Sequence, residues 1–284
     1  MSGAARTPTA AAETVAATRL AVWGDPIAHS KSPALHAAAY RVLGLDWEYD
    51  RRQVNAAGFA DALDGLDASW RGLSLTMPLK EEAFRAAKIR DAHAESTGAV
   101  NTLLFGDELA GYNTDVGGII DALAEAGVTK AQNVRVLGAG ATAASALVAA
   151  AELGAAHVEV SARRPERAAG VIARGERLGI AVAARTLDDV VLEADLTIAT
   201  LPSGTALPAE MSARLAARGG TLFDAAYAPW PSALAVAWGD GPVVSGLGML
   251  LHQAVRQIRI FRHGDPLVPL PDEADVVAAM RAVL

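Results

Sequence analysis

The second half of the chain alternates two kinds of segment. Six short apolar runs, each typical of a buried β-strand, are separated by stretches that mostly have helical spacing. The strand-like runs cover residues 133–137, 157–161, 180–184, 195–200, 220–224 and 242–245. Strands that alternate with helices are joined by crossovers, and crossovers connect parallel strands. The pattern therefore predicts a doubly wound, Rossmann-like α/β domain over residues 116–246.

The first half of the chain predicts another α/β domain, with a mixed sheet. A strand-like apolar segment at residues 70–75 precedes two more at 99–105 and 108–112. The last two flank a Gly-Asp turn and predict a hairpin, which adds antiparallel pairing to an otherwise parallel sheet. We expect this domain at residues 19–115.

Three further segments complete the expected layout. Ser32 and Pro33 have the arrangement of a helix N-cap followed by proline at the first helical position, which predicts a helix from there to Leu43. Residues 247–284 contain helical segments that we expect to pack back on the first domain. Residues 1–18 are small and polar, and we expect them to form a flexible tail.

Composition narrows the possible functions. The 284 residues suffice for about two domains. The net charge is −7, without a run of like charges, so we expect no nucleic-acid partner. With no cysteine and six histidines that lack ligand spacing, we expect neither thiol chemistry nor a metal site. Because no long apolar stretch or secretory signal is present, we expect a cytoplasmic protein without a membrane partner.

A glycine-rich turn follows the first strand of the predicted Rossmann-like domain. Residues 138–143 read GAGATA, between the strand NVRVL and an alanine-rich helix. A dinucleotide turn needs Gly138 for the bend, Gly140 for close approach of the pyrophosphate, and a small residue at Ala143 for helix packing. An ordinary glycine turn before a helix is the alternative. The surrounding strand and helix favour the dinucleotide.

The end of the next predicted strand favours NADP over NAD. After Ser161 the chain continues with Ala162, Arg163 and Arg164. An NAD site would place an acidic residue here for the ribose hydroxyls, whereas the paired N–H donors of arginine suit a 2′-phosphate. The alternative is that both arginines merely coat a solvated loop. We expect NADPH as the cofactor.

Five short stretches resemble, in their order and spacing, the shikimate dehydrogenase family, which comprises shikimate and quinate 5-dehydrogenases. They read SKSP (30–33), SLTMPLK (74–80), GAVNT (98–102), NTD (113–115) and GLGMLLHQ (246–253). The resemblance spans residues 20–265. It implies an NADP-dependent oxidoreductase that reversibly reduces 3-dehydroshikimate to shikimate, a step toward chorismate and the aromatic amino acids.

The resemblance also implies a catalytic pair and a set of substrate contacts. Lys80 would exchange the proton of the reacting oxygen, and Asp115 would hold Lys80 in place. Ser30 and Ser32 would bind the substrate carboxylate at a helix start, where free N–H groups favour an anion. The remaining implied substrate contacts are Thr76, Asn101, Tyr227 and Gln253.

Ordinary structural roles compete with these assignments. Ser32 and Asp115 could each serve as a helix N-cap, and Ser30 could be a turn residue. Most lysines are solvated surface charges. Lys80, however, follows a Pro78 turn at the carboxyl end of a predicted strand, where open α/β sheets bind ligands.

The predicted cofactor contacts outnumber the substrate contacts. Met249 is expected to pack beside the nicotinamide rather than to take part in the chemistry. The predicted contacts are Gly138, Ala139, Gly140, Ala141, Thr142, Ala143, Ala162, Arg163, Arg164, Thr200, Gly246 and Met249.

Two residues depart from the family pattern. Ser74 stands where many members have asparagine, which removes a two-ended amide from the expected substrate pocket. Ala162 stands where they have an asparagine beside the phosphate-binding arginine, which removes an adenosine contact. A quinate or related cyclohexane-acid dehydrogenase is therefore one alternative, and a non-catalytic NADPH-binding module is another. Both a monomer and a homodimer are compatible with the sequence.

Overall fold

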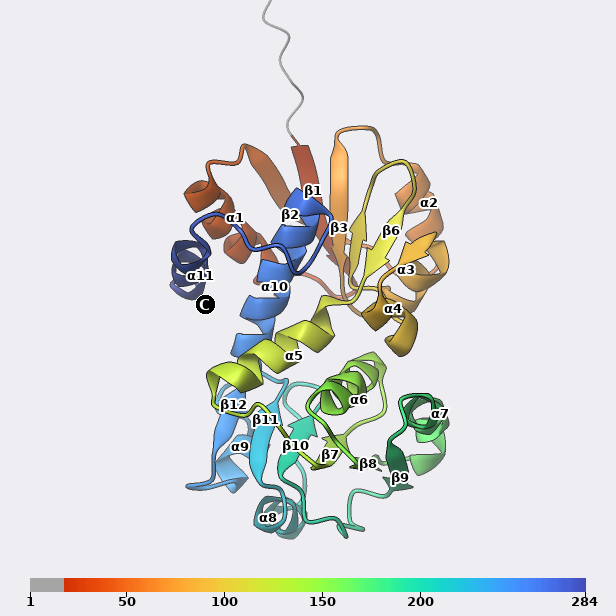
Figure 1. The fold of residues 1–284 in the computed structure, drawn as a ribbon, viewed down its shortest axis with the longest axis vertical. Helices are drawn as coiled ribbons and strands as arrows, with labels where there is room; N and C mark the ends of the chain where they lie inside the picture. Colours follow the sequence, from red (N-terminus) through yellow and green to blue (C-terminus); the bar gives the residue numbers. More distant parts are fainter. Residues whose placement is uncertain (1–17) are drawn as a thin grey trace, which may run out of the picture.

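The computed structural model describes residues 18–284, which form two α/β units joined by helices α5 (Thr114–Glu125) and α10 (Gly246–His263) (Figure 1). Residues 1–17, most of the predicted tail, lie outside the described residues. The tail prediction is wrong at its last residue, because Thr18 opens the first strand and pairs with Trp47.

The first unit is built on a six-stranded mixed sheet. Its central strands β1 and β3 are buried and parallel, and the following hairpin pairs antiparallel to β3, as the sequence predicts. In spatial order the strands are β2 (Trp47–Gln53), β1 (Thr18–Gly24), β3 (Trp70–Leu75), β5 (Thr102–Leu104), β6 (Ala110–Tyr112) and β4 (Ile89–Arg90).

Four helices connect these strands: α1 (Ser32–Leu43), α2 (Phe59–Asp64), α3 (Lys80–Ala86) and α4 (Ala92–Thr97). The predicted N-cap of α1 is wrong. Lys31 occupies the cap position without a side-chain hydrogen bond, and Ser32 is the first helical residue. The hydroxyl that accepts a backbone N–H here belongs to Ser30, which accepts from Ser32 at 3.3 Å.

The second unit has a six-stranded sheet in which every pair is parallel, so the predicted doubly wound arrangement is confirmed. Its strands, in spatial order, are β12 (Val243–Ser245), β11 (Thr221–Asp224), β10 (Leu196–Ala199), β7 (Asn133–Leu137), β8 (His157–Ser161) and β9 (Ala181–Arg185). Its helices are α6 (Ala141–Glu152), α7 (Ala169–Arg177), α8 (Ala209–Ala217) and α9 (Ala233–Ala237), with a 3₁₀ turn at Pro165–Ala168.

One crossover of the second unit contains no helix. Residues 186–195 return from the edge strand β9 to β10 as a loop. A buried ion pair between Arg135 and Glu159, 2.8 Å apart, binds this loop through the backbone of Leu192, which donates to Glu159 and accepts from Arg135. The pair satisfies backbone groups that a helix would otherwise satisfy internally.

Helices α5 and α10 bring the two units together. The buried side chains of Val116, Ile119 and Leu123 on α5 belong to the core of the second unit. Helix α10 starts beside the second sheet and continues across the first, where it packs with α1 and α11 (Glu273–Arg281) (Figure 1). No helix within residues 18–284 has the length and apolar character needed to span a membrane.

Candidate active site

A cavity of about 380 Å³ lies between the two units. Its lining includes every residue predicted to bind the substrate or to act as the catalytic pair: Ser30, Ser32, Thr76, Lys80, Asn101, Asp115, Tyr227 and Gln253. Three predicted cofactor contacts, Thr142, Gly246 and Met249, also line it. The parallel strands β1 and β3 end at this cavity, as expected for a ligand site on an α/β sheet.

Lys80 and Asp115 form an ion pair at the floor of the cavity. The Lys80 ammonium lies 2.5 Å from Asp115 Oδ2, and the two side chains are 14% and 7% exposed. Lys80 is the first residue of α3, and Asp115 is the second residue of α5. A charged lysine this far from water needs a partner, and the carboxylate provides it.

Asp115 is not a helix cap, which removes its ordinary structural explanation. The cap is Asn113, whose side chain accepts a hydrogen bond from the backbone N–H of Asp115 at 3.0 Å. The Asp115 carboxylate is thereby free for side-chain contacts. Its Oδ1 accepts from Asn101 Nδ2 at 2.8 Å, while Oδ2 accepts from Lys80.

The cavity lining also presents hydroxyl groups. Ser30 and Ser32 lie at the start of α1, where the first backbone N–H groups have no helical partner. Neighbouring Lys31 contacts the backbone of Leu284 at 2.8 Å and is not among the lining residues. Tyr227 lies on the segment after β11, and burial raises the pKa of its phenol, so the group is neutral at ordinary pH.

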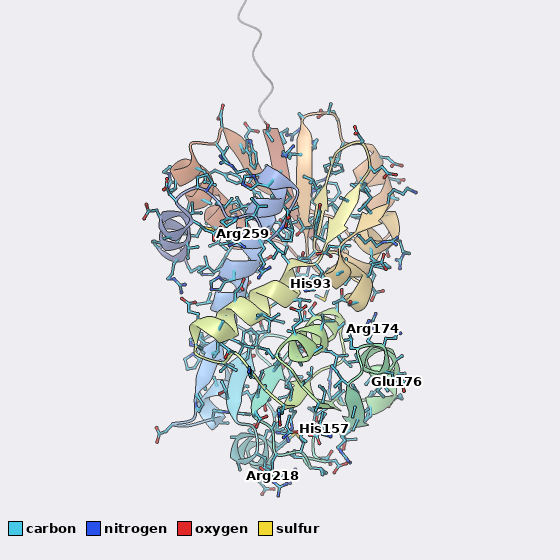
Figure 2. The ribbon with its side chains drawn as sticks, viewed as in Figure 1. His93, His157, Arg174, Glu176, Arg218 and Arg259 are labelled. Carbon is cyan, nitrogen blue, oxygen red and sulfur yellow. The ribbon has the colours of Figure 1, made fainter. Side chains whose placement is uncertain are left out.

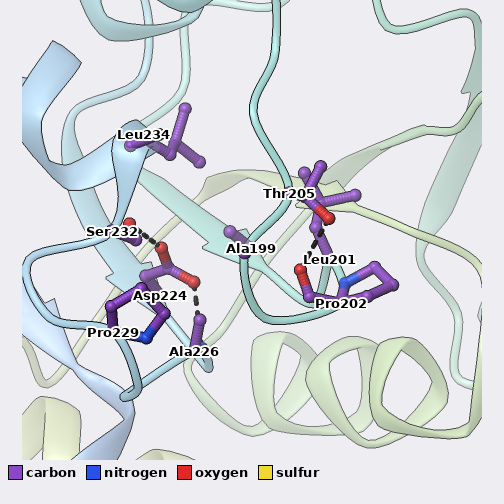
Figure 3. Close-up of a pocket in the computed structure, with 11 residues that line it drawn as sticks. Ala199, Leu201, Pro202, Thr205, Asp224, Ala226, Pro229, Ser232 and Leu234 are labelled. Atoms are coloured by element: carbon purple, nitrogen blue, oxygen red, sulfur yellow. Dashed lines mark hydrogen bonds between the residues drawn. The ribbon is translucent and has the colours of Figure 1, made fainter.

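A smaller cavity of about 130 Å³ is lined by the segments that follow β10 and β11 and by the start of α9 (Figure 3). Asp224 at the end of β11 accepts hydrogen bonds from the Ser232 hydroxyl and from the backbone N–H of Ala226. Burial raises the pKa of Asp224, and these two hydrogen bonds oppose that shift. Because Ser232 also caps α9, the network fixes the loop that carries Tyr227.

The glycine turn of the second unit has the geometry that a dinucleotide requires. Gly138 has φ +115°, and a Cβ there would lie 2.5 Å from the Thr200 hydroxyl. A Cβ at Gly140 would meet nothing within 4 Å, so the space above the turn is open. Gly140 also begins α6 without a side-chain cap, which leaves the helix N–H groups available to a pyrophosphate.

The other predicted cofactor residues lie around this turn. Ala143 is fully buried and packs α6 against the sheet. Arg163 and Arg164 follow β8 and are exposed, whereas Ala162 is buried and its backbone bonds to β9. The predicted contacts that do not line the cavity are Gly138, Ala139, Gly140, Ala141, Ala143, Ala162, Arg163, Arg164 and Thr200.

Gln257 is a cavity residue that the sequence reasoning missed. It is 2% exposed, lies one turn after Gln253 on α10, and accepts a hydrogen bond from Ser74 at 2.9 Å. The available signal was a second glutamine at i+4 on an otherwise apolar helix face. A polar side chain on such a face usually has buried partners.

The chain is similar in sequence to proteins named shikimate dehydrogenase. A family model described as the shikimate dehydrogenase substrate binding domain matches residues 22–103. The NADP(+) shikimate dehydrogenase of Methanococcoides burtonii is 36% identical over 257 residues, which are 87% of this chain and 93% of the relative. That of Bordetella avium is 36% identical over 279 residues, covering 94% and 96%.

Solved structures agree with these relatives. The crystal structure of Mycobacterium tuberculosis shikimate dehydrogenase superposes with a TM-score of 0.82 at 40% identity, covering 93% of this chain and 99% of the other. Shikimate 5-dehydrogenase from Thermus thermophilus, solved in complex with NADP(H) and shikimate, gives a TM-score of 0.77 at 33% identity, covering 94% and 99%.

Proposed function

Because the chain belongs to the shikimate dehydrogenase family, we propose that it catalyses the reversible, NADPH-dependent reduction of 3-dehydroshikimate to shikimate. It would thus be an NADP-dependent oxidoreductase acting on a CH–OH group. The observation that carries the proposal is the Lys80–Asp115 pair at the floor of a cavity that both units line. Such a cavity lets one unit hold a cofactor and the other a substrate.

NADPH, when bound, would supply the hydride that the carbonyl carbon of the substrate accepts. Lys80 would donate a proton to the carbonyl oxygen, so that the ketone becomes an alcohol. Asp115 holds the ammonium in place through its 2.5 Å contact. Asn101 holds the carboxylate in turn, with its amide nitrogen 2.8 Å from Asp115 Oδ1.

The cavity wall supplies the substrate contacts. Ser30 and Ser32 would donate to the carboxylate of the ring acid at the start of α1, aided by the helix dipole. Thr76 and Gln253 would bind ring hydroxyls, with Asn101 beside them. Tyr227 would close the carboxylate end as a neutral hydrogen-bond donor.

The second unit would hold NADPH. Residues 138–143 would bind the pyrophosphate at the start of α6, and Ala162 would lie beneath the adenosine. Arg163 and Arg164 would bind the 2′-phosphate, since both are exposed at the carboxyl end of β8. Gly246 and Met249, which line the cavity, and Thr200, which lies against Gly138, would contact the nicotinamide end of the cofactor.

The layout of the chain is part of the proposal. We assign the substrate-binding domain to residues 19–115, the NADP-binding domain to 116–246, and the returning C-terminal helices to 247–284. We also expect the enzyme in the cytoplasm, as a monomer or a homodimer.

A steady-state assay of reduced-nicotinamide absorbance tests the function. Shikimate and quinate would each be offered with NADP and with NAD. The highest kcat/KM is expected for shikimate with NADP. A higher value for quinate would replace this proposal by the quinate alternative, and a higher value for shikimate with NAD would overturn the choice of cofactor. Binding of NADPH without turnover of either acid would indicate a non-catalytic module.

A further inference from the structure

We propose that Gln257 is a positioning residue of the active site, which orients Asn101 toward Asp115 through Thr102. This inference rests on the proposed function, because it concerns the support of the Lys80–Asp115 pair. Gln257 reaches the cavity from α10, whereas the residues it contacts lie on β3, on β5 and just before β5.

The first step is the orientation of the Gln257 amide. Its nitrogen lies 3.3 Å from the backbone carbonyl of Asn101 and 3.1 Å from the Thr102 hydroxyl. A backbone carbonyl can only accept, so the end of the amide that faces it must be the NH₂. The oxygen then points to Ser74, whose hydroxyl donates to it at 2.9 Å.

The second step is the direction of the Thr102 hydroxyl. This group has one hydrogen, and it already accepts from Gln257. Its hydrogen is therefore directed to Asn101 Oδ1, 2.9 Å away. Thr102 is fully buried and Gln257 nearly so, which leaves the hydroxyl few other partners.

The third step connects this chain to the catalytic pair. Asn101 Oδ1 accepts from Thr102 and from the backbone N–H of Thr114, at 2.9 Å each. With the oxygen held on that side, Asn101 Nδ2 must face Asp115 Oδ1, at 2.8 Å. The path Gln257, Thr102, Asn101, Asp115 is a continuous set of hydrogen bonds that ends at the partner of Lys80.

Ser74 takes part in the same arrangement. Its hydroxyl on β3 is buried and donates to the Gln257 oxygen at 2.9 Å, which leaves the Gln257 NH₂ group facing Asn101 and Thr102. We therefore infer that Ser74 and Gln257 act together to orient Asn101.

The decisive variant is Gln257→Glu, which keeps the shape and one oxygen but replaces the NH₂ donor. As a carboxylate it cannot donate to Thr102, and the Thr102 hydrogen turns away from Asn101. We expect kcat at about pH 8 to fall by ~10-fold, the effect of one buried hydrogen bond, with less change in KM. The exposed Gln132→Glu is the matched control and should retain wild-type kcat.

The variant also has a signature in its pH dependence. Burial raises the pKa of an introduced carboxyl above its ordinary value, and the protonated acid regains a donor. The ratio of variant to wild-type kcat should therefore rise as the pH falls from about 8 to 5. Gln257→Met, which is apolar at every pH, should show a low and constant ratio.

The outcomes separate this inference from the function on which it rests. If wild type and Gln132→Glu turn over shikimate while Gln257→Glu matches them at every pH, the positioning role is wrong and the function stands. If wild type does not turn over shikimate, both are wrong. A reduced but pH-independent ratio for Gln257→Glu would indicate a packing role only and would also overturn the proposal.

A second pair of variants covers the case in which the Gln257 variants do not fold. Thr102→Val removes the hydroxyl at nearly constant volume, and Thr102→Ser retains it. We expect the valine variant to lose ~10-fold in kcat and the serine variant to recover most of it. Equal kcat in the two folded variants would overturn the proposed path.

Discussion

Lys80 is held by contacts that few lysines have. It follows the turn at Pro78, begins α3, and is 14% exposed beside the Asp115 carboxylate. Its backbone carbonyl accepts from Val100, which ties the start of the helix to the segment that leads into β5. The position of the ammonium is therefore fixed from both the backbone and the side chain, as a proton donor requires.

Replacing Lys80 with alanine should lower kcat by ~100-fold or more, since a positioned acid contributes about that much. KM should change less, because the carboxylate and ring contacts remain. The check is steady-state kinetics with shikimate and NADP, with the exposed Lys88→Ala as control. A Lys80→Ala variant within a few-fold of wild-type kcat would rule out the assigned role.

His36 makes stability depend on pH. Burial lowers its pKa from 6.5 to about 3, and a side-chain hydrogen bond to Gln257, which favours the protonated imidazole, partly offsets that shift. Between these values the unfolded chain binds a proton that the folded chain does not, so stability falls as the pH falls. From pH 7 to pH 4 this group should lower the free energy of unfolding by about 3 kcal/mol.

Urea unfolding of wild type, His36→Gln and the exposed His263→Gln at pH 7 and pH 4 measures this contribution. His36→Gln should lose about 3 kcal/mol less than wild type over that interval, whatever its stability at pH 7. His263→Gln should keep the wild-type difference. Equal differences in all three proteins would show that His36 is not the responsible group.

At the scale of elements, the close approach of α5 and α10 sets the width of the active site. A Cβ at Gly118 would lie 2.9 Å from Gln253 Cβ and 3.0 Å from the backbone oxygen of Met249. Both of those residues line the cavity. Glycine at this position therefore allows the helix with Gln253 to lie against the helix with Asp115.

Gly118→Ala should push the two helices apart. We expect a loss of about 1–3 kcal/mol in the free energy of unfolding, as for other overpacked sites, and a higher KM for shikimate. Gly170→Ala on α7 is the control, because that residue is exposed and its nearest contact is the flexible end of Arg174. The control should be neutral or stabilising by up to ~1 kcal/mol. Equal stability and KM in both variants would contradict the packing argument.

At the scale of the whole molecule, the two units share structure as well as a cavity. Helix α5 contributes Asp115 to the site and Ile119 to the core of the second unit. On the surface His93 of α4 contacts Glu152 of α6 at 2.6 Å, and Figure 2 labels His93 near this junction. We therefore expect the two units to unfold together.

A variant with tryptophans in one unit tests this cooperativity. Trp230→Phe with Trp238→Phe leaves Trp23, Trp47 and Trp70, all in the first unit. NADP at about 100 times its Kd should raise Tm by roughly 5 °C, although its proposed site lies on the second unit. The midpoints of the thermal unfolding transitions followed by tryptophan fluorescence and by far-UV circular dichroism should rise equally. A fluorescence transition that NADP leaves unmoved would mean that the units unfold independently.

Features with local causes could be predicted from the amino-acid sequence alone. The six strands of the second sheet follow from short apolar runs. The antiparallel hairpin of the first sheet, β5 and β6, follows from a Gly-Asp turn between two other apolar runs. The turn at Gly138 and Gly140 follows from backbone conformations that glycine adopts readily. The predicted polar stretches meet in one cavity because several of them lie at the ends of neighbouring strands.

Features that depend on contacts between residues distant in the sequence became visible only in the tertiary structure. Neither Ser32 nor Asp115 caps its helix. Lys31 stands at the cap position of α1, and Asn113 caps α5. The loop at residues 186–195 replaces a helix because a buried ion pair from other strands binds its backbone. The role of Gln257 was hidden in the sequence, since it depends on groups more than 150 residues away that only the packing of α10 on β3 and β5 brings within hydrogen-bond distance.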